Sequence, residues 1–183
     1  MPLGQVSVFC GSRPGNQPAF AAAAEGLGTM LGVRGIGLVY GGASVGLMGV
    51  LADAALASGG RVTGVITESL ADHEIAHRGL TRLVVVHTMH ERKARMAELS
   101  DAVIMLPGGF GTYEEFMEAV TRVHLGIDEK PCGVLNVDGF FDHLLRFLAH
   151  AVAKAFIPAP LLSGLIVADE PANLLDTLSR AAG

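Results

Sequence analysis

Short apolar runs alternate with longer segments of helical pattern along almost the whole chain. The runs are nearly continuous rather than alternating apolar with polar, which is typical of strands buried on both faces. They predict strands at residues 5–10, 36–40, 61–66, 81–86, 102–106, 132–137 and 165–168. Helical patterns fill the connections, at residues 18–33, 45–58, 88–99, 113–125 and 140–156 and from Pro171 onward.

This alternation predicts an α/β protein with a doubly wound parallel sheet of seven strands and helices on both faces. A length of 183 residues favours a single domain over residues 1–183. Residues 67–79 are polar and fit no strand-helix rhythm, so we expect them to form a flap. We expect Thr88 and Asp169 to cap the helices that follow them.

Glycine turns follow three of the predicted strands. Because ligands of such sheets bind beyond the carboxyl ends of the strands, we expect these turns to line one crevice. They comprise Gly11 and Ser12, Gly41 and Gly42, and Gly108, Gly109 and Gly111. The third turn, PGGFGT, leads directly into a helix, whose free N–H groups favour an anion such as a phosphate.

Glu115 has two competing explanations. With Thr112 as N-cap, Glu115 takes the third helical position, and T-x-x-E is then a capping box. A carboxylate beside a phosphate site can instead be a catalytic group. Both explanations remain open from the sequence.

Composition and charge limit the partners. Net charge is −5, which gives no overall basic field to hold nucleic acid or an anionic membrane. No apolar stretch approaches the roughly 18 residues of a membrane span, and the first residues resemble no signal peptide, so we expect a cytoplasmic protein.

Half of the residues are hydrophobic, with much of the excess in alanine-rich helices, and we therefore expect a homodimer or larger homo-oligomer. Cys10 and Cys132 are expected to be buried thiols.

Two motifs point to chemistry that we do not predict. His73, Glu74 and His77 spell HEIAH, a match to the zinc motif H-E-x-x-H for which Glu98 is a conceivable third ligand. That motif needs a stable helix, and Gly79 follows too soon, so we predict no metal. The turn YGGASVGLMG lacks the lysine of a P-loop, and Ala43 stands where G-x-G-x-x-G needs its middle glycine.

Four stretches of the chain together resemble the LOG family of cytokinin riboside 5'-monophosphate phosphoribohydrolases, formerly labelled possible lysine decarboxylases. They are VYGGASVGLMG at residues 39–49, MHERKARM at 89–96, DAVIMLPGGFGTYEE at 101–115 and LGIDEKPCGVLNVDGFFDHLL at 125–145. The resemblance implies a Rossmann-like fold, a homodimer or larger assembly, no cofactor, and hydrolysis of a nucleoside 5'-monophosphate to free base and ribose 5-phosphate. One departure is Ala43, where the family commonly has a glycine.

By motif position, the resemblance implies Arg92 and Glu115 as the catalytic pair. The substrate site it implies comprises Gly11, Ser12, Gly41, Gly42, Glu74, Arg92, Lys93, Gly108, Gly109, Phe110, Gly111, Thr112, Tyr113, Glu114 and Glu115. Arg95 forms an i,i+4 pair with Glu91 that needs no function, so we leave it out.

The residue types agree with this activity. Cleavage of a ribosyl–base bond passes through a cation-like sugar, which a carboxylate stabilises while polarising the attacking water. An arginine can hold a phosphate or orient that carboxylate. We therefore predict a hydrolase acting on AMP or its N6-substituted cytokinin relatives. The alternative is a nucleotide or molybdenum-cofactor carrier of similar fold that binds without hydrolysis.

Overall fold

A computed structural model describes residues 3–71 and 75–183 as an α/β fold around one seven-stranded parallel sheet of order β4-β3-β2-β1-β5-β6-β7. The strands are β1 (Gln5–Phe9), β2 (Gly37–Tyr40), β3 (Val62–Thr67), β4 (Arg82–Val86), β5 (Ala102–Met105), β6 (Cys132–Leu135) and β7 (Ile166–Ala168). The predicted fold class and all the predicted strands are confirmed.

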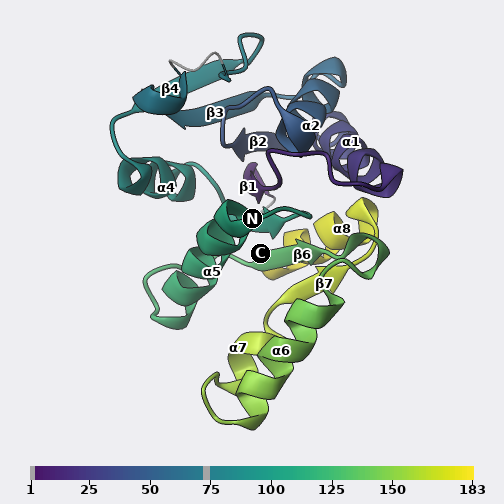
Figure 1. Ribbon diagram of the computed structural model, residues 1–183, viewed down its shortest axis with the longest axis vertical. Helices are drawn as coiled ribbons and strands as arrows, with labels where there is room; N and C mark the ends of the chain where they lie inside the picture. Colours follow the sequence, from purple (N-terminus) through teal and green to yellow (C-terminus); the bar gives the residue numbers. More distant parts are fainter. Residues whose placement is uncertain (1–2, 72–74) are drawn as a thin grey trace.

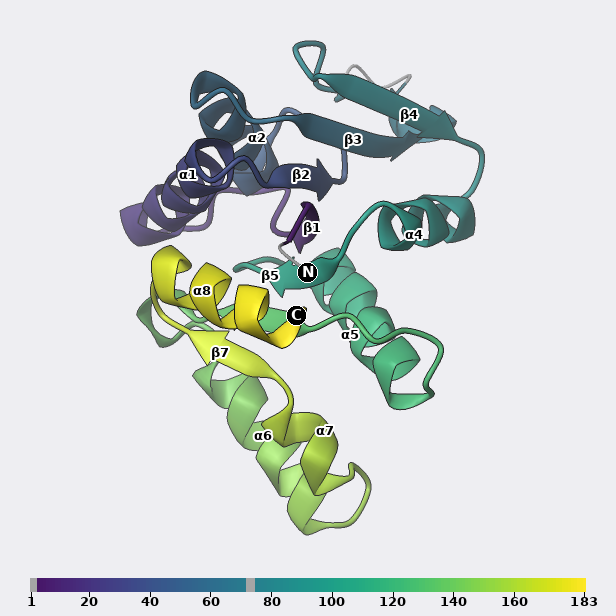
Figure 2. The ribbon, with the colours of Figure 1, turned by 180° about the vertical axis from the view of Figure 1, so that it is seen from behind.

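Helices cover both faces of the sheet (Figures 1 and 2). One face carries α1 (Pro18–Val33), α2 (Gly46–Ala57) and α8 (Pro171–Ala181), which contribute Leu27, Leu51 and Leu175 to one buried core. The other face carries α4 (Met89–Glu98) and α5 (Phe110–His124), which contribute Met96 and Phe116 to a second core. Alternate residues of each central strand feed the two cores, which is why those strands are apolar throughout.

The predicted helix 140–156 is interrupted. Residues 137–139 form a 3₁₀ turn in which Asp138 has a φ of 50°, and Asn136 accepts the backbone N–H of Phe141 at 2.7 Å. Helix α6 (Asp142–Ala153) then ends two residues before Ala155, whose φ of 62° is left-handed, and a short helix α7 (Ala159–Ser163) follows. Figure 1 shows α6 and α7 extending beyond the sheet at its β7 end.

Two further elements differ from the sequence-based expectation. The segment expected to be an irregular flap begins with a short helix, α3 (Glu68–Ala71), and later contains an isolated antiparallel bridge from Ala76 to Ala43. The N-cap of α8 is Glu170 rather than Asp169, whereas Thr88 caps α4 as predicted by accepting the Glu91 N–H at 3.1 Å.

The strand order reverses at β1 and β5, where the chain leaves toward opposite faces of the sheet. At this point the turns after the two strands touch: the N–H of Gly11 donates to the carbonyl of Pro107 at 3.0 Å. A Cβ on Gly11 would lie 3.3 Å from the Cα of Gly108, and a Cβ on Gly108 would lie 2.9 Å from the Gly11 nitrogen, so glycine at both positions favours this close approach. Such a switch point is the usual ligand site of an open parallel sheet.

Across residues 3–71 and 75–183, none of the helices combines the length and apolar character needed to cross a membrane.

The close crossing of α1 and α2 gives a test of the packing. A Cβ on Gly28 would lie 2.4 Å from the Leu51 carbonyl, so Gly28→Ala should lower the free energy of unfolding by about 1–3 kcal/mol. Gly26→Ala, in the same helix, is the control: its Cβ would meet only Pro171 at 3.8 Å, and it should be neutral or stabilising by about 0.5–1 kcal/mol. Urea denaturation measures both, and equal effects would contradict the crossing.

Candidate active site

A cavity of about 420 Å³ lies at the carboxyl ends of β1, β2 and β5. Its wall includes Ser12, Gly41, Arg92, Gly109, Phe110, Gly111, Thr112, Glu114 and Glu115. A second hollow of about 520 Å³ adjoins it, sharing Ser12, Gly109 and Phe110 and adding Gly11 and Gly108. The three predicted glycine turns therefore do meet in one region.

Three predicted site residues stand apart from these walls, and a fourth cannot be placed against them. Among the residues that the structure describes, Gly42, Lys93 and Tyr113 lie outside both cavity walls. Glu74 lies outside the described residues. Its predicted role as a substrate-site acid stays a prediction.

The predicted capping box of α5 is wrong. The helix begins at Phe110 with Gly109 as N-cap, so Thr112 is the third helical residue and Glu115 the sixth. Thr112 is buried, and a Cβ on Gly108 would lie within 2.1 Å of its hydroxyl oxygen, which places Thr112 against the turn rather than at the cap position. Helix capping therefore no longer explains Glu115.

The first turn of α5 leaves the N–H groups of Phe110, Gly111 and Thr112 without intrahelical acceptors. A Cβ on Gly109 or Gly111 would meet no atom within 4 Å among the described residues. The backbone is thus open to a close approach from the cavity. This is the geometry of an anion site at a helix N-terminus.

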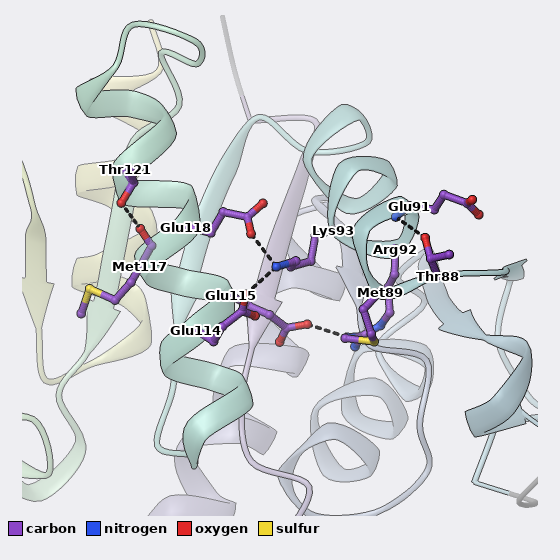
Figure 3. A network of polar contacts seen from close by, with 10 residues as sticks. All are labelled: Thr88, Met89, Glu91, Arg92, Lys93, Glu114, Glu115, Met117, Glu118 and Thr121. Atoms are coloured by element: carbon purple, nitrogen blue, oxygen red, sulfur yellow. Dashed lines mark hydrogen bonds and ion pairs between the residues drawn. The ribbon is translucent and has the colours of Figure 1, made fainter.

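Arg92 and Glu115 form an ion pair across the cavity, with Nη1 and Oε1 2.5 Å apart (Figure 3). Their side chains are 9% and 10% exposed, so both charges are almost fully removed from water. The Arg92 Nε also donates to the Val65 carbonyl at 2.9 Å. A Cβ on Gly41 would lie 2.3 Å from Nη2, so a glycine at this position gives the guanidinium its place.

The electrostatics of the cavity follow from this burial. Burial raises the pKa of Glu115, and the charge and hydrogen bond of Arg92 offset that rise only in part. Burial, reinforced by the charge of Glu115, raises the pKa of the Cys10 thiol in the cavity wall to about 12. Both predicted buried cysteines are confirmed as buried and free. At neutral pH, Cys10 is a neutral neighbour rather than a nucleophile.

The remaining wall of the cavity is apolar and was not predicted. It is formed by Ala43, Val45, Met48, Ile66, Leu70, Ile75 and Met89. These residues come from several separate segments, so no local sequence pattern marks them. The exceptions are Ala43, Val45 and Met48, which lie in the VYGGASVGLMG stretch, and Met89, which lies one helical turn before Arg92.

His77 of the HEIAH motif is engaged on both ring nitrogens. Its Nε2 lies 2.8 Å from Asp53 Oδ1, and its Nδ1 accepts the Gly79 N–H at 3.1 Å. His73 lies outside the described residues, and Glu98 pairs with Arg95 at 2.8 Å. Within the described part of the chain, no three His, Cys, Asp or Glu side chains gather as a metal site would require.

The chain is similar in sequence to a known protein family and to several of its members. The model of the family described as possible lysine decarboxylase matches residues 48–178. The cytokinin riboside 5'-monophosphate phosphoribohydrolase of Rhodococcoides fascians is 53% identical over 88% of this chain and 82% of its own length. This chain belongs to the LOG family. A LOG member of Arabidopsis thaliana with the same activity in its name is 45% identical over 96% of this chain and 83% of its own.

Solved structures of more distant proteins share the fold of this LOG protein. The molybdenum cofactor binding protein of Rippkaea orientalis superposes with a TM-score of 0.74, covering 100% of this chain and 99% of the other. Sequence identity is 21%, so this likeness concerns the fold.

We expect the purified LOG protein to carry no stoichiometric zinc, because both nitrogens of His77 already have partners. Elemental analysis after dialysis tests this, and a chelator should leave activity unchanged. Zinc near one atom per chain, with activity lost in chelator and restored by zinc, would contradict the expectation.

Proposed function

We propose that this LOG protein hydrolyses the N-glycosidic bond of a nucleoside 5'-monophosphate to free base and ribose 5-phosphate. AMP and N6-substituted cytokinin riboside 5'-monophosphates are the proposed substrates. The observation that carries the proposal is the buried Arg92–Glu115 pair, which shares a cavity with the open N-terminus of α5. The names of the relatives at 53% and 45% identity support it.

Each part of the cavity has a role in this proposal. The N–H groups at the start of α5 bind the 5'-phosphate, and the apolar wall with Met48 and Ile75 receives the base. The ribose then lies beside Glu115, whose carboxylate stabilises the cation-like sugar and polarises the attacking water. Arg92 holds that carboxylate in place by charge and hydrogen bond.

Two other functions are less well supported. A carrier that only binds a nucleotide or the molybdenum cofactor has little use for a buried carboxylate paired with arginine. Lysine decarboxylation, the older family label, gains nothing from the three lysines: Lys93 is ion-paired, Lys130 contacts Asp128 and the Ala97 carbonyl, and Lys154 is exposed at the end of α6. The proposed reaction needs no cofactor, and we propose that it takes place in the cytoplasm.

The decisive test replaces Glu115 by glutamine. Gln keeps the size of the side chain and an oxygen that accepts from Arg92, so the free energy of unfolding should stay within about 1 kcal/mol. Turnover of AMP, followed as release of adenine, should fall at least ~100-fold because the catalytic charge is gone. Glu114→Gln changes an exposed carboxylate one residue away and should lower turnover less. Hydrolysis by Glu115→Gln at close to the wild-type rate would make this protein a nucleotide binder.

We also propose a homodimer or larger assembly. Exposed apolar side chains occur on and beside α5 and α6: Leu125 follows α5, Phe147 lies within α6 and Phe156 follows it, and they are 63%, 65% and 86% exposed. Light scattering should give a multiple of the 19.0 kDa chain mass at micromolar concentration. Phe147→Ser should weaken the assembly, whereas Val33→Ser, equally exposed at the end of α1, should not. A monomeric wild-type mass would refute the proposal.

A further inference from the structure

Lys93 lies next to Arg92 on α4, but it contacts a different part of α5. Its Nζ is 2.5 Å from a carboxylate oxygen of Glu114 and 2.5 Å from one of Glu118. Figure 3 shows the two acids on α5 with the lysine between them, while Arg92 reaches Glu115 alongside. The three acids Glu114, Glu115 and Glu118 therefore receive two cations from consecutive residues.

We propose that Lys93 is a positioning residue of this hydrolase, which fixes α5 against α4 by bridging Glu114 and Glu118 and thereby places Glu115 against Arg92. This assignment rests on the proposed function. It replaces the contact with substrate that the family resemblance implies for Lys93.

The packing of the two helices shows why such a bridge is needed. Helix α4 packs on β3 and β4, whereas α5 packs on β5 and β1. The catalytic carboxylate and its arginine thus come from helices that rest on different parts of the sheet. The side-chain bridges of Arg92 and Lys93 connect one helix to the other at this level, beside the apolar core that Met96 and Phe116 share.

Burial separates this bridge from an ordinary surface ion pair. The Lys93 side chain is only 16% exposed, whereas its partners Glu118 and Glu114 are 37% and 55% exposed, so the burial lies on the side of the cation. An isolated exposed pair contributes little, but a cation shared by two carboxylates one turn apart restricts both. The ammonium has three N–H donors, of which two are occupied here. Within the described residues, Lys93 also stays outside the cavity wall.

Charge gives the bridge a second effect. Glu115 faces Arg92, Lys93, Glu114 and the neutral thiol of Cys10. The charge of Glu114 raises the pKa of Glu115, and the charge of Lys93 lowers it. Removing Lys93 would leave two unneutralised carboxylates on the same side of α5, so the pKa of Glu115 should rise.

The first experiment compares steady-state kinetics of Lys93→Met and wild type with AMP. Positioning predicts that kcat falls at least tenfold while KM changes less than about threefold, since the phosphate contacts remain. The acid limb of the kcat/KM profile should move to higher pH. Glu118→Gln should also lower kcat. The double variant Lys93→Met/Glu118→Gln should have a kcat little lower than that of Lys93→Met alone. Lys93→Arg should restore part of the loss.

A matched control is Arg95→Met, which also removes a cation from α4. Arg95 pairs with Glu98, whose side chain is exposed. Arg95→Met should leave kcat, KM and the pH profile unchanged. A direct role in substrate binding gives the opposite pattern for Lys93→Met. In that case KM for AMP and the inhibition constant of ribose 5-phosphate rise at least tenfold with kcat retained, Glu118→Gln behaves as wild type, and the positioning assignment is overturned.

A readout independent of activity separates this inference from the proposed function. Carbon-13 NMR titration of Glu115, assigned with Glu115→Gln, should show a higher pKa in Lys93→Met, or in Lys93→Gln if the first variant does not fold, because both remove the cation and keep the acids. An unchanged pKa would overturn the role of Lys93, whatever the reaction. Failure of the wild type to release base from any nucleoside 5'-monophosphate would instead overturn the function and leave this titration valid.

Discussion

The buried ion pair between Arg92 and Glu115 is the constraint on which the rest of the site depends. Removing both charges from water costs several kcal/mol per ion, and the pair offsets this only in good geometry with further hydrogen bonds. The Val65 carbonyl supplies one such bond, and the missing side chain of Gly41 supplies the space. Strand β3 and the turn after β2 thus support the ion pair through backbone groups rather than through side chains.

The net effect of this environment is to destabilise the negative charge on the Glu115 carboxylate. Burial raises the pKa of Glu115 more than Arg92 lowers it, so its negative charge is poorly solvated in the resting protein. A cation-like sugar placed beside it would relieve that condition. In the proposed reaction, the same feature that weakens the fold at neutral pH would therefore favour the transition state over the ground state.

Sequence alone was sufficient for the sheet and for the meeting of the glycine turns, because continuous apolar runs and turn glycines are local signals. It failed at the start of α5, since Gly109 caps the helix without a side chain and Thr112 offered a more familiar cap. It also missed the end of α6, where Ala155 adopts a left-handed conformation that usually marks glycine. The bridge from Lys93 to Glu118 joins separate helices, so only the packed structure reveals it.

The backbone and the side chain of Phe110 have different surroundings. It is the first residue of α5, its backbone belongs to the anion site, and its side chain is 94% exposed at the border of both cavities. A side chain that packs on so little is held by neither core, so the sheet and its helices place almost no demand on its size or shape. The side chain at position 110 can therefore change in size or polarity, and with it the rim that the two cavities share, without altering how the chain folds.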